Sequence, residues 1–366
     1  MKLKKWKRVI TTGMSCLTMS ACALCATSCD AYTERKMQLI TWGVVSGIAM
    51  GEFAYMEAFF NNGFLFLESR GLGLDGYEVG TLGIYKDKKV EIPSTYKGKP
   101  VLVLTAGAWK DLDMQTLTIP ESIQKTNAWS MPDCDELMEI IVDENNRYFK
   151  SVEGNIYSKD GTVFVQYAGG KKAENFRIPD GVVEIDFGAF AGCHNLQTVN
   201  FPVGVERIED QAFMCCNGLT NVYLAEGVTT IGIDSFSRCP KLKQVSFPDT
   251  LEEIGSWAFY HCKALEYVNI PDSVTTLQGR AFSDCINLKE IVFGNGIIEI
   301  DSNAFSNCSS LKSVYYHGTE AEWEMISIEE GSEVLLSARR YYYSEIKPTE
   351  EGKFWYYDKK GKIVEW

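Results

Sequence analysis

The sequence has few histidines and few basic residues, and it lacks several patterns on which enzymes depend. It contains only three histidines, and its 49 acidic residues outnumber its 36 basic ones, for a formal net charge of −13. Nucleic-acid binding requires lysine and arginine to neutralise phosphates, so nucleic acid is excluded as an expected partner. The sequence also has no glycine-rich phosphate-binding loop and no Gly-x-Ser-x-Gly elbow. Neutral or cationic partners are therefore expected.

One pattern recurs six times between Phe190 and Leu311 with a spacing of 23 residues. In each copy a phenylalanine is followed at three-residue steps by cysteine, leucine and a β-branched residue. The phenylalanines are Phe190, Phe213, Phe236, Phe259, Phe282 and Phe305, and the cysteines are Cys193, Cys216, Cys239, Cys262, Cys285 and Cys308. Such a period is typical of a leucine-rich-repeat solenoid. One copy cannot bury its apolar side chains alone, so neighbouring copies must stack.

Alternating apolar residues within each copy predict a short parallel strand, as at Val199 and Phe201, which Pro202 ends. The predicted fold is a repeat solenoid of mainly parallel β-strands with short helical turns, a β/α superhelix with capped ends. We expect the solenoid to occupy residues 65–318.

The motif Leu196-x-x-Val199-x-Phe201-Pro202, continued by Ala212-Phe213-x-x-Cys216, resembles the BspA-type leucine-rich repeat of surface proteins of mucosal bacteria and some protozoa. The resemblance implies a non-catalytic, secreted or surface-displayed binding protein. Some members of that family resemble adhesins for host extracellular-matrix proteins. The resemblance implies no particular ligand.

The N-terminus predicts export. Residues 1–28 combine five basic residues and no acidic one with a weakly apolar run, as in a signal peptide. Removing them leaves 31 basic against 49 acidic residues, a net charge of −18. The residues before Cys29 resemble a bacterial lipobox, which would make Cys29 a lipid anchor and the only membrane contact. Ala21-Cys22-Ala23 would instead suit an ordinary signal peptidase. The expected location is extracellular or at the cell surface.

Residues 29–64 are expected to cap the first coil, with an amphipathic helix near 39–60.

Residues 65–318 also contain an irregular section. Trp109 and Trp129 take the phenylalanine position, but the stretch from Trp129 to Phe190 is much longer than one repeat, which requires an insertion. Two alternating segments around Asp160-Gly161 predict a β-hairpin inserted at about 143–177, which should project from the solenoid.

Residues 319–366 are predicted to form a C-terminal cap. Thr319 begins a capping-box helix, and Trp323 is expected to cover the last coil. An aromatic β-hairpin should follow, with strands at 354–357 and 363–366 joined by a turn at 359–361.

The repeated cysteines predict a ladder of buried thiols. Side chains at one position of stacked coils point in parallel, which is poor geometry for disulfides. Cys134 and Cys215 fall outside the ladder, and the sequence leaves open a disulfide to either. Histidines stand beside Cys193 and Cys262, but the other copies lack them, so no Cys–His nucleophile is expected. Zinc would need converging ligands, and we expect neither metal nor cofactor. Residues 143–146 could contact calcium, although a solvated turn is the preferred interpretation.

The candidate ligand-binding face consists of the residues that alternate with the buried ones on the repeat strands. They are Asn200, Tyr223, Gln244, Ser246, Tyr267, Asn269, Glu290, Val292 and Tyr315. Tyrosine is common at protein interfaces, although it is also favoured on any exposed strand. The expected partner is a host extracellular or bacterial surface macromolecule, most simply a protein.

Two other functions remain open from the sequence. The run Trp355-Tyr356-Tyr357-Asp358, followed by Gly361-Lys362, is similar to a choline-binding repeat, so the C-terminal hairpin could bind a cell-wall glycan. An extracellular hydrolase using Cys262 is the second alternative.

Overall fold

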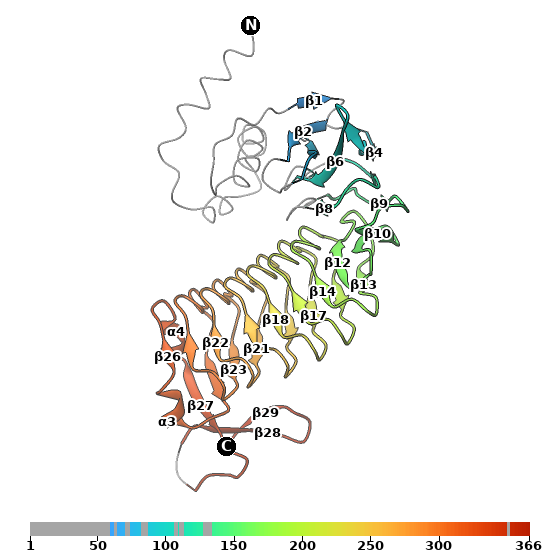
Figure 1. Cartoon of the computed structure of the whole chain (residues 1–366). Coiled ribbons are helices and arrows are strands. Elements are labelled where there is room, and N and C mark those ends of the chain that lie inside the picture. Colours follow the sequence, from blue (N-terminus) through green and yellow to red (C-terminus); the bar gives the residue numbers. More distant parts are fainter. Residues whose placement is uncertain are drawn as a thin grey trace, which may run out of the picture.

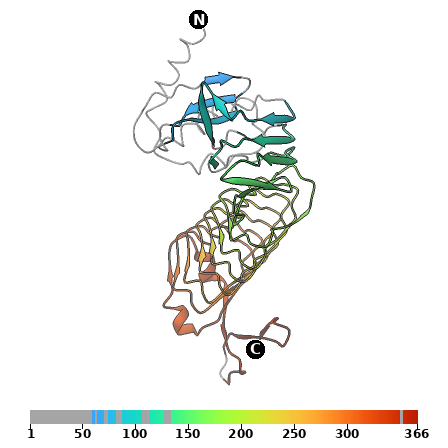
Figure 2. The ribbon, with the colours of Figure 1, turned by 45° about the vertical axis from the view of Figure 1, so that its right-hand side comes forward.

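The computed structural model describes residues 59–61, 64–69, 74–81, 87–105, 109, 113–126, 134–349 and 352–366. Its coils stack along one axis, with the N-terminal strands at one end and helices α3 and α4 with the C-terminal hairpin at the other (Figures 1 and 2). The predicted signal peptide, Cys29, Trp129 and residues 39–58 of the predicted capping helix lie outside the described residues.

Two rows of parallel strands run along the stack. The first row is a ten-stranded sheet in the order β10 (Phe149–Val152), β11 (Asn155–Ser158), β12 (Val163–Gln166), β14 (Glu184–Ile185), β16 (Arg207–Ile208), β18 (Thr230–Ile231), β20 (Glu253–Ile254), β22 (Thr276–Leu277), β24 (Glu299–Ile300) and β26 (Ser327–Ile328).

The second row is divided into two sheets. The first holds β13 (Asn175–Arg177), β15 (Thr198–Asn200), β17 (Asn221–Tyr223) and β19 (Gln244–Ser246). The second holds β21 (Tyr267–Ile270), β23 (Glu290–Phe293), β25 (Ser313–Tyr316), β27 (Arg339–Tyr343), β28 (Phe354–Tyr357) and β29 (Ile363–Glu365). Strands of the central coils pair one repeat length apart, as in Val199 with Val222 and Ile208 with Ile231. This register confirms the predicted solenoid.

The third side of each coil, which we call the turn side, connects the first row back to the second. It corresponds to residues 209–216 and their equivalents, and it consists of consecutive turns rather than the expected short helical segments. Two positions per coil have left-handed backbone, for example Trp257 (φ 63°) and His261 (φ 63°). A right-handed helix needs φ near −60°, so these positions exclude one.

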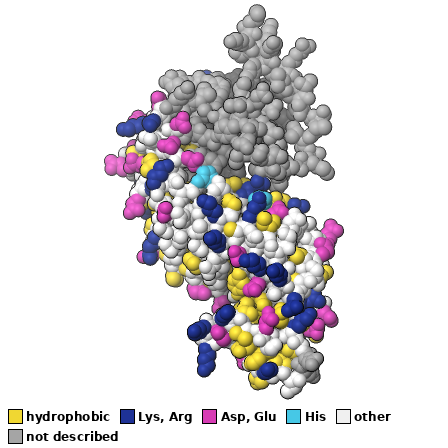
Figure 3. Space-filling model, turned by 180° about the vertical axis from the view of Figure 1, so that it is seen from behind, with side chains coloured by type: hydrophobic (Ala, Val, Ile, Leu, Met, Phe, Trp, Pro, Cys, Tyr) yellow, Lys and Arg dark blue, Asp and Glu magenta, His cyan; other side chains and the backbone are white. Residues whose placement is uncertain are grey.

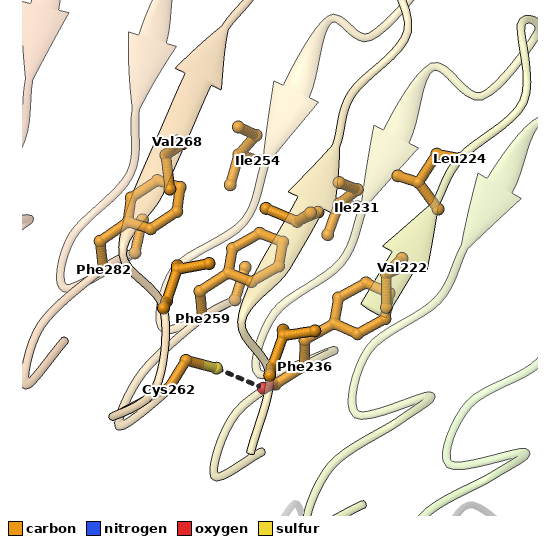
Figure 4. Close-up of a cluster of buried hydrophobic side chains, with 14 of the residues drawn as sticks. Val222, Leu224, Ile231, Phe236, Ile254, Phe259, Cys262, Val268 and Phe282 are labelled. Atoms are coloured by element: carbon orange, nitrogen blue, oxygen red, sulfur yellow. Dashed lines mark hydrogen bonds between the residues drawn. The ribbon is translucent and has the colours of Figure 1, made fainter. Parts of the chain in front are cut away.

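The repeated phenylalanines form one stack through the core. Their rings lie parallel, with centroid distances from 4.6 Å for Phe190 and Phe213 to 5.5 Å for Phe282 and Phe305. All six side chains are fully buried, and Figure 4 shows Phe236, Phe259 and Phe282 following one another between aliphatic residues of both strand rows. The coils therefore share one continuous core, as the period predicts.

The inserted hairpin is present, but it does not project from the solenoid. Strands β10, β11 and β12 form an antiparallel meander, and β12 then pairs in parallel with β14. Tyr157 and Phe164 are buried, and the Phe164 ring stacks on Phe190 at 4.6 Å. The hairpin is therefore part of the first row, because its aromatic residues extend the core.

A regular coil begins earlier than the sequence pattern indicated. The backbone N–H of Tyr167 donates to the carbonyl of Ala189, as that of Phe190 does to Ala212 one coil later. Tyr167 thus takes the phenylalanine position one repeat before Phe190, and its ring stacks on Phe190 at 5.3 Å. Tyr167, Gly170, Ala173 and Phe176 stand where the repeat has phenylalanine, cysteine, leucine and a β-branched residue, which concealed this coil.

The N-terminal end of the described chain is built from strands. An antiparallel meander of β1 (Phe59–Asn61), β2 (Phe64–Glu68) and β3 (Tyr77–Thr81) continues into β6 (Lys99–Leu104), which pairs with β5 (Thr95–Tyr96) and β8 (Lys125–Thr126). A separate sheet holds β4 (Lys89–Glu91), β7 (Thr116–Ile119) and β9 (Glu139–Val142). Residues 59 and 60 thus lie in a strand rather than in the predicted helix. The expected boundary at residue 64 falls at the start of β2.

At the C-terminal end both strand rows continue beyond residue 318. Helix α3 (Glu320–Trp323) has the predicted capping box at Thr319, and α4 is Glu333–Ser337. Trp323 is 4% exposed and packs against Phe293 and Tyr316, so it is part of the core, but it does not close the last coil as predicted. Strands β26 and β27 then add one more coil. Within the described residues, no helix has the length and apolar character that crossing a membrane requires.

Removing one ring from the stack should destabilise the solenoid strongly. We expect Phe259→Ala to lower the free energy of unfolding by about 3–5 kcal/mol, because it leaves a cavity between two stacked rings. Chemical denaturation followed by circular dichroism measures this. Ile298→Ala is the control, because Ile298 is 64% exposed, and it should change the free energy by less than about 0.5 kcal/mol. Equal effects of the two changes would contradict the shared core.

Candidate binding surface

The outward residues of the second strand row form an exposed surface over β15 to β23. Strand pairing aligns Asn200, Tyr223 and Ser246 side by side. These three residues are exposed, as are Gln244, Asn269 and Glu290. Tyr223 is 45% exposed, and its hydroxyl donates to Oε1 of Gln244 at 3.3 Å. We call these six residues the open face.

Val292 and Tyr315 do not belong to the open face, contrary to the sequence prediction. Val292 is fully buried and Tyr315 is 4% exposed, in a cluster with Tyr341 and Trp355. The Trp355 ring meets that of Tyr315 at 5.5 Å, and the Tyr315 hydroxyl donates to the Glu365 carboxylate at 3.0 Å. The C-terminal strands β27 to β29 therefore cover this end of the row.

Tyr267 marks the border between the open and covered parts. It is half-buried and packs against the same cluster. Burial is the main cause of the raised pKa of its hydroxyl, and the neighbouring Tyr357 contributes as well. Tyr267 is thus partly covered by the hairpin.

The sequence did carry a signal for the cover. Strands β15, β17 and β19 have the sequences Thr-Val-Asn, Asn-Val-Tyr and Gln-Val-Ser, with one aliphatic residue each. By contrast, β23 ends in Ile-Val-Phe and β25 in Val-Tyr-Tyr, three consecutive apolar or aromatic residues. Strands that are apolar on both faces are covered on both faces.

The aromatic hairpin forms as predicted but turns its tryptophan inward. Strands β28 and β29 pair antiparallel, and Trp355 is fully buried, with its indole N–H donating to the carbonyl of Tyr316 at 3.1 Å. Tyr356 stacks on Trp366 at 4.1 Å. The tryptophan is therefore not accessible to a glycan.

The repeated thiols form a ladder of hydrogen bonds. Each of the last five donates to the carbonyl of the phenylalanine 26 residues earlier, as Cys262 does to Phe236 at 3.2 Å (Figure 4). The five thiols are those of Cys216, Cys239, Cys262, Cys285 and Cys308. The eight described cysteines are not joined in disulfides.

Cys134 makes the same kind of bond as the ladder cysteines, although Gly170 of the intervening coil separates it from them. It is 2% exposed, and its thiol donates to the carbonyl of Trp109 at 2.9 Å. Leu137 and Ile140 follow it at the three-residue steps of the repeat. This spacing could have identified it. The position was concealed because the phenylalanine three residues earlier is absent.

No arrangement for nucleophilic catalysis surrounds Cys262. Burial raises the pKa of its thiol to about 12, whereas a nucleophilic cysteine needs a lowered pKa. The imidazole of His261 lies 3.8 Å from the carboxylate of Asp284, and burial lowers its pKa. The thiol itself points into the core toward Phe236 (Figure 4).

Two groups of acidic or amide side chains offer oxygen atoms of the kind that bind cations. The first group is residues 143–146, the calcium candidate from the sequence. Its Asn146 amide is buried and donates to the carbonyls of Pro120 and Ile123, so it supports the neighbouring coil. Within the described chain, one group of three carboxylates, those of Glu299, Asp301 and Glu329, has oxygen atoms within 4.8 Å of one another. Glu329 accepts from the backbone of Ser302. Exposed acidic groups often lie this close, so the cluster alone assigns no metal.

The repeat agrees with a known family of sequences. Residues 166–278 and 208–325 match the model of the BspA type leucine rich repeat region, in six copies. This part of the chain is a BspA-type leucine-rich repeat region. Leucine-rich repeats of this type generally serve binding rather than catalysis. No similar protein is found among curated proteins.

Solved structures of bacterial leucine-rich repeat proteins resemble the BspA-type region and its flanks. A protein from Eubacterium ventriosum has a TM-score of 0.59 at 22% identity, covering 75% of this chain and 69% of its own. One from Bacteroides ovatus has 0.48 at 20% identity, covering 80% and 70%. The pneumococcal vaccine antigen PcpA has 0.40 at 16% identity, covering 79% and 94%. The first of these similarities supports the fold.

The buried thiols of the BspA-type region should be unreactive in the folded protein. With a pKa of about 12 for Cys262, only about one thiol in ten thousand is ionised at pH 8. We expect iodoacetamide to leave Cys262 unmodified in native protein and to alkylate it readily in urea, as measured by peptide mass spectrometry. Rapid native alkylation of Cys262 would contradict its place in the core.

The cover over Val292 and Tyr315 should depend on Trp355. Trp355→Ala removes a fully buried side chain, a loss of about 3–5 kcal/mol, so β28 and β29 should undock. Hydrogen–deuterium exchange in residues 352–366 should increase, and a dye that binds exposed apolar surface should fluoresce more. Ile346→Ala is the control, because Ile346 lies just before the hairpin and is 81% exposed. Unchanged exchange in Trp355→Ala would show that the hairpin is held by other contacts.

Proposed function

We propose that this protein is a non-catalytic binding protein, displayed at the cell surface or secreted, that recognises a partner protein through the open face. The observation that carries the proposal is the exposed row of Asn200, Tyr223 and Ser246 on three adjacent repeat strands. The core positions of these coils are uniform, whereas the outward positions vary, as in scaffolds that present a binding surface.

The open face has the composition of a protein-binding surface. Tyrosine is enriched among residues that dominate binding energy, and Tyr223 offers an aromatic ring with a polar hydroxyl at the centre of the row. Exposed polar side chains surround it. On the side of the molecule shown in Figure 3, acidic and basic side chains are interspersed. With a net charge of −13, the chain favours neutral or cationic partners.

Export is part of the proposal. The N-terminal signal and the lipobox-like sequence at Cys29 support display on the outside of a cell, with Cys29 as lipid anchor. The BspA-type region fits such a location, and a host extracellular or bacterial surface macromolecule is the proposed partner.

The two other functions have less support. A glycan site on the hairpin would need an accessible Trp355, which is fully buried. A hydrolase would need an activated thiol at Cys262, whose pKa is raised instead.

Replacing Tyr223 should weaken partner binding. We expect Tyr223→Ala to lower affinity about tenfold or more, which is typical of an aromatic hot spot. The mature chain is tested by biolayer interferometry on immobilised extracellular-matrix proteins and on bacterial cells. Tyr148→Ala is a matched control, because Tyr148 is 46% exposed but lies outside the repeat strands. If both variants bind like the unmodified protein, the open face is not the binding surface.

A further inference from the structure

The turn side carries one cluster that the repeat does not require. Four side chains, which we call the cation–aromatic ridge, form a row in which two arginines flank two aromatic rings: Arg280, Trp257, Tyr260 and Arg238. The Arg280 guanidinium lies over the Trp257 ring at 4.7 Å, and the Arg238 guanidinium lies over Tyr260 at 5.6 Å. The two rings meet edge to face at 5.0 Å. The ridge spans three successive coils.

Trp257 and Tyr260 depart from the repeat. At the Trp257 position the other regular coils have Gly188, Gln211, Asp234, Arg280 and Asn303. This position has left-handed backbone (φ 63° at Trp257), which is unfavourable for a bulky side chain. A strained, partly exposed tryptophan has no role in the buried stack. Such local departures from a repeat are expected at functional sites, for example where a surface binds a partner.

The ridge is positively charged on an acidic protein. Arg280 is exposed, and within the described residues neither Arg280 nor Lys263 forms a salt bridge. Asp284 is the nearest negative group to Tyr260 and His261. The Asp234 carboxylate interacts with Arg238, so the uncompensated positive charge of this area is that of Arg280 and Lys263. The exposed Arg280 is therefore the group of the ridge that favours an anionic ligand.

We propose that the cation–aromatic ridge binds an acidic peptide segment of a partner protein. The exposed Arg280 guanidinium lies over the Trp257 ring and can still present N–H donors to a carboxylate, which arginine binds in a bidentate manner. The ring faces beneath the two guanidiniums are covered, so they are not available for stacking with a sugar. Protein carboxylates thus fit the ridge better than an acidic polysaccharide does. This site lies on a different side of the coil from the open face and does not depend on it.

The test uses the mature chain and fluorescence anisotropy with a short fluorescein-labelled glutamate-rich peptide. The same peptide with glutamine in place of glutamate, and heparin, are the other probes. We expect binding of the glutamate peptide, with affinity lowered about tenfold or more by Arg280→Gln. Arg280→Lys should restore only part of it, because lysine lacks the planar fork.

Two control variants separate a specific site from general charge. Arg177→Gln removes a similarly exposed arginine from β13 on the second strand row, and Tyr223→Ala alters the open face. Both should bind the glutamate peptide like the unmodified protein. Trp257→Ala, checked for folding by circular dichroism, should weaken binding as Arg280→Gln does.

Four outcomes would each overturn the proposal. They are failure of the unmodified protein to bind the glutamate peptide, equal binding of the glutamine peptide, an equal loss with Arg177→Gln, and binding of heparin alone.

Discussion

The constant length of the repeat is the constraint on which this structure depends. It places phenylalanine on phenylalanine, with rings about parallel at 4.6 to 5.5 Å. It also lets the last five of the six repeat cysteines reach back to the carbonyl of the phenylalanine 26 residues earlier, as from Cys239 to Phe213. A buried carbonyl needs a donor, and cysteine is both small enough for the core and able to donate weakly. This explains why cysteine, rather than alanine or valine, occupies that position.

The same register determines which surfaces are free to vary. Inward residues of both strand rows and of the turn side meet their own copies in the next coil, so their size is constrained. Outward residues of the second row face solvent over β15 to β19 and at Asn269 and Glu290, and the left-handed positions of the turn side point away from the core. The variable residues therefore lie on two sides of each coil, the second strand row and the turn side. Each side can present a binding surface without altering the stacked core.

Features set by the period could be predicted from the sequence, and those set by distant contacts could not. Six phenylalanines, their cysteines and the capping box at Thr319 follow local rules, and the structure has them. The apolar residues of β23 and β25 indicate that this end of the row is covered, but no local pattern specifies what covers it: Tyr315, for example, bonds to Glu365, 50 residues beyond it. Cys134 and Tyr167 were missed for another reason. The coil of Cys134 lacks the phenylalanine, and the coil of Tyr167 has none of the four residues by which the repeat was recognised, although the backbone pairing keeps the register.

The buried cover changes what the repeat can present to a partner. Trp355 and Tyr341 shield apolar residues on the outward side of β23 and β25, as a capping element does at the end of a solenoid. The hairpin thus keeps these apolar residues away from water. Packing over them accounts for its buried aromatic residues without a ligand. Trp257 and Tyr260 have no such reason, because the adjacent coils stack without aromatic residues at those positions. In a scaffold this regular, the aromatic residues that packing leaves unexplained are the ones that most directly indicate recognition.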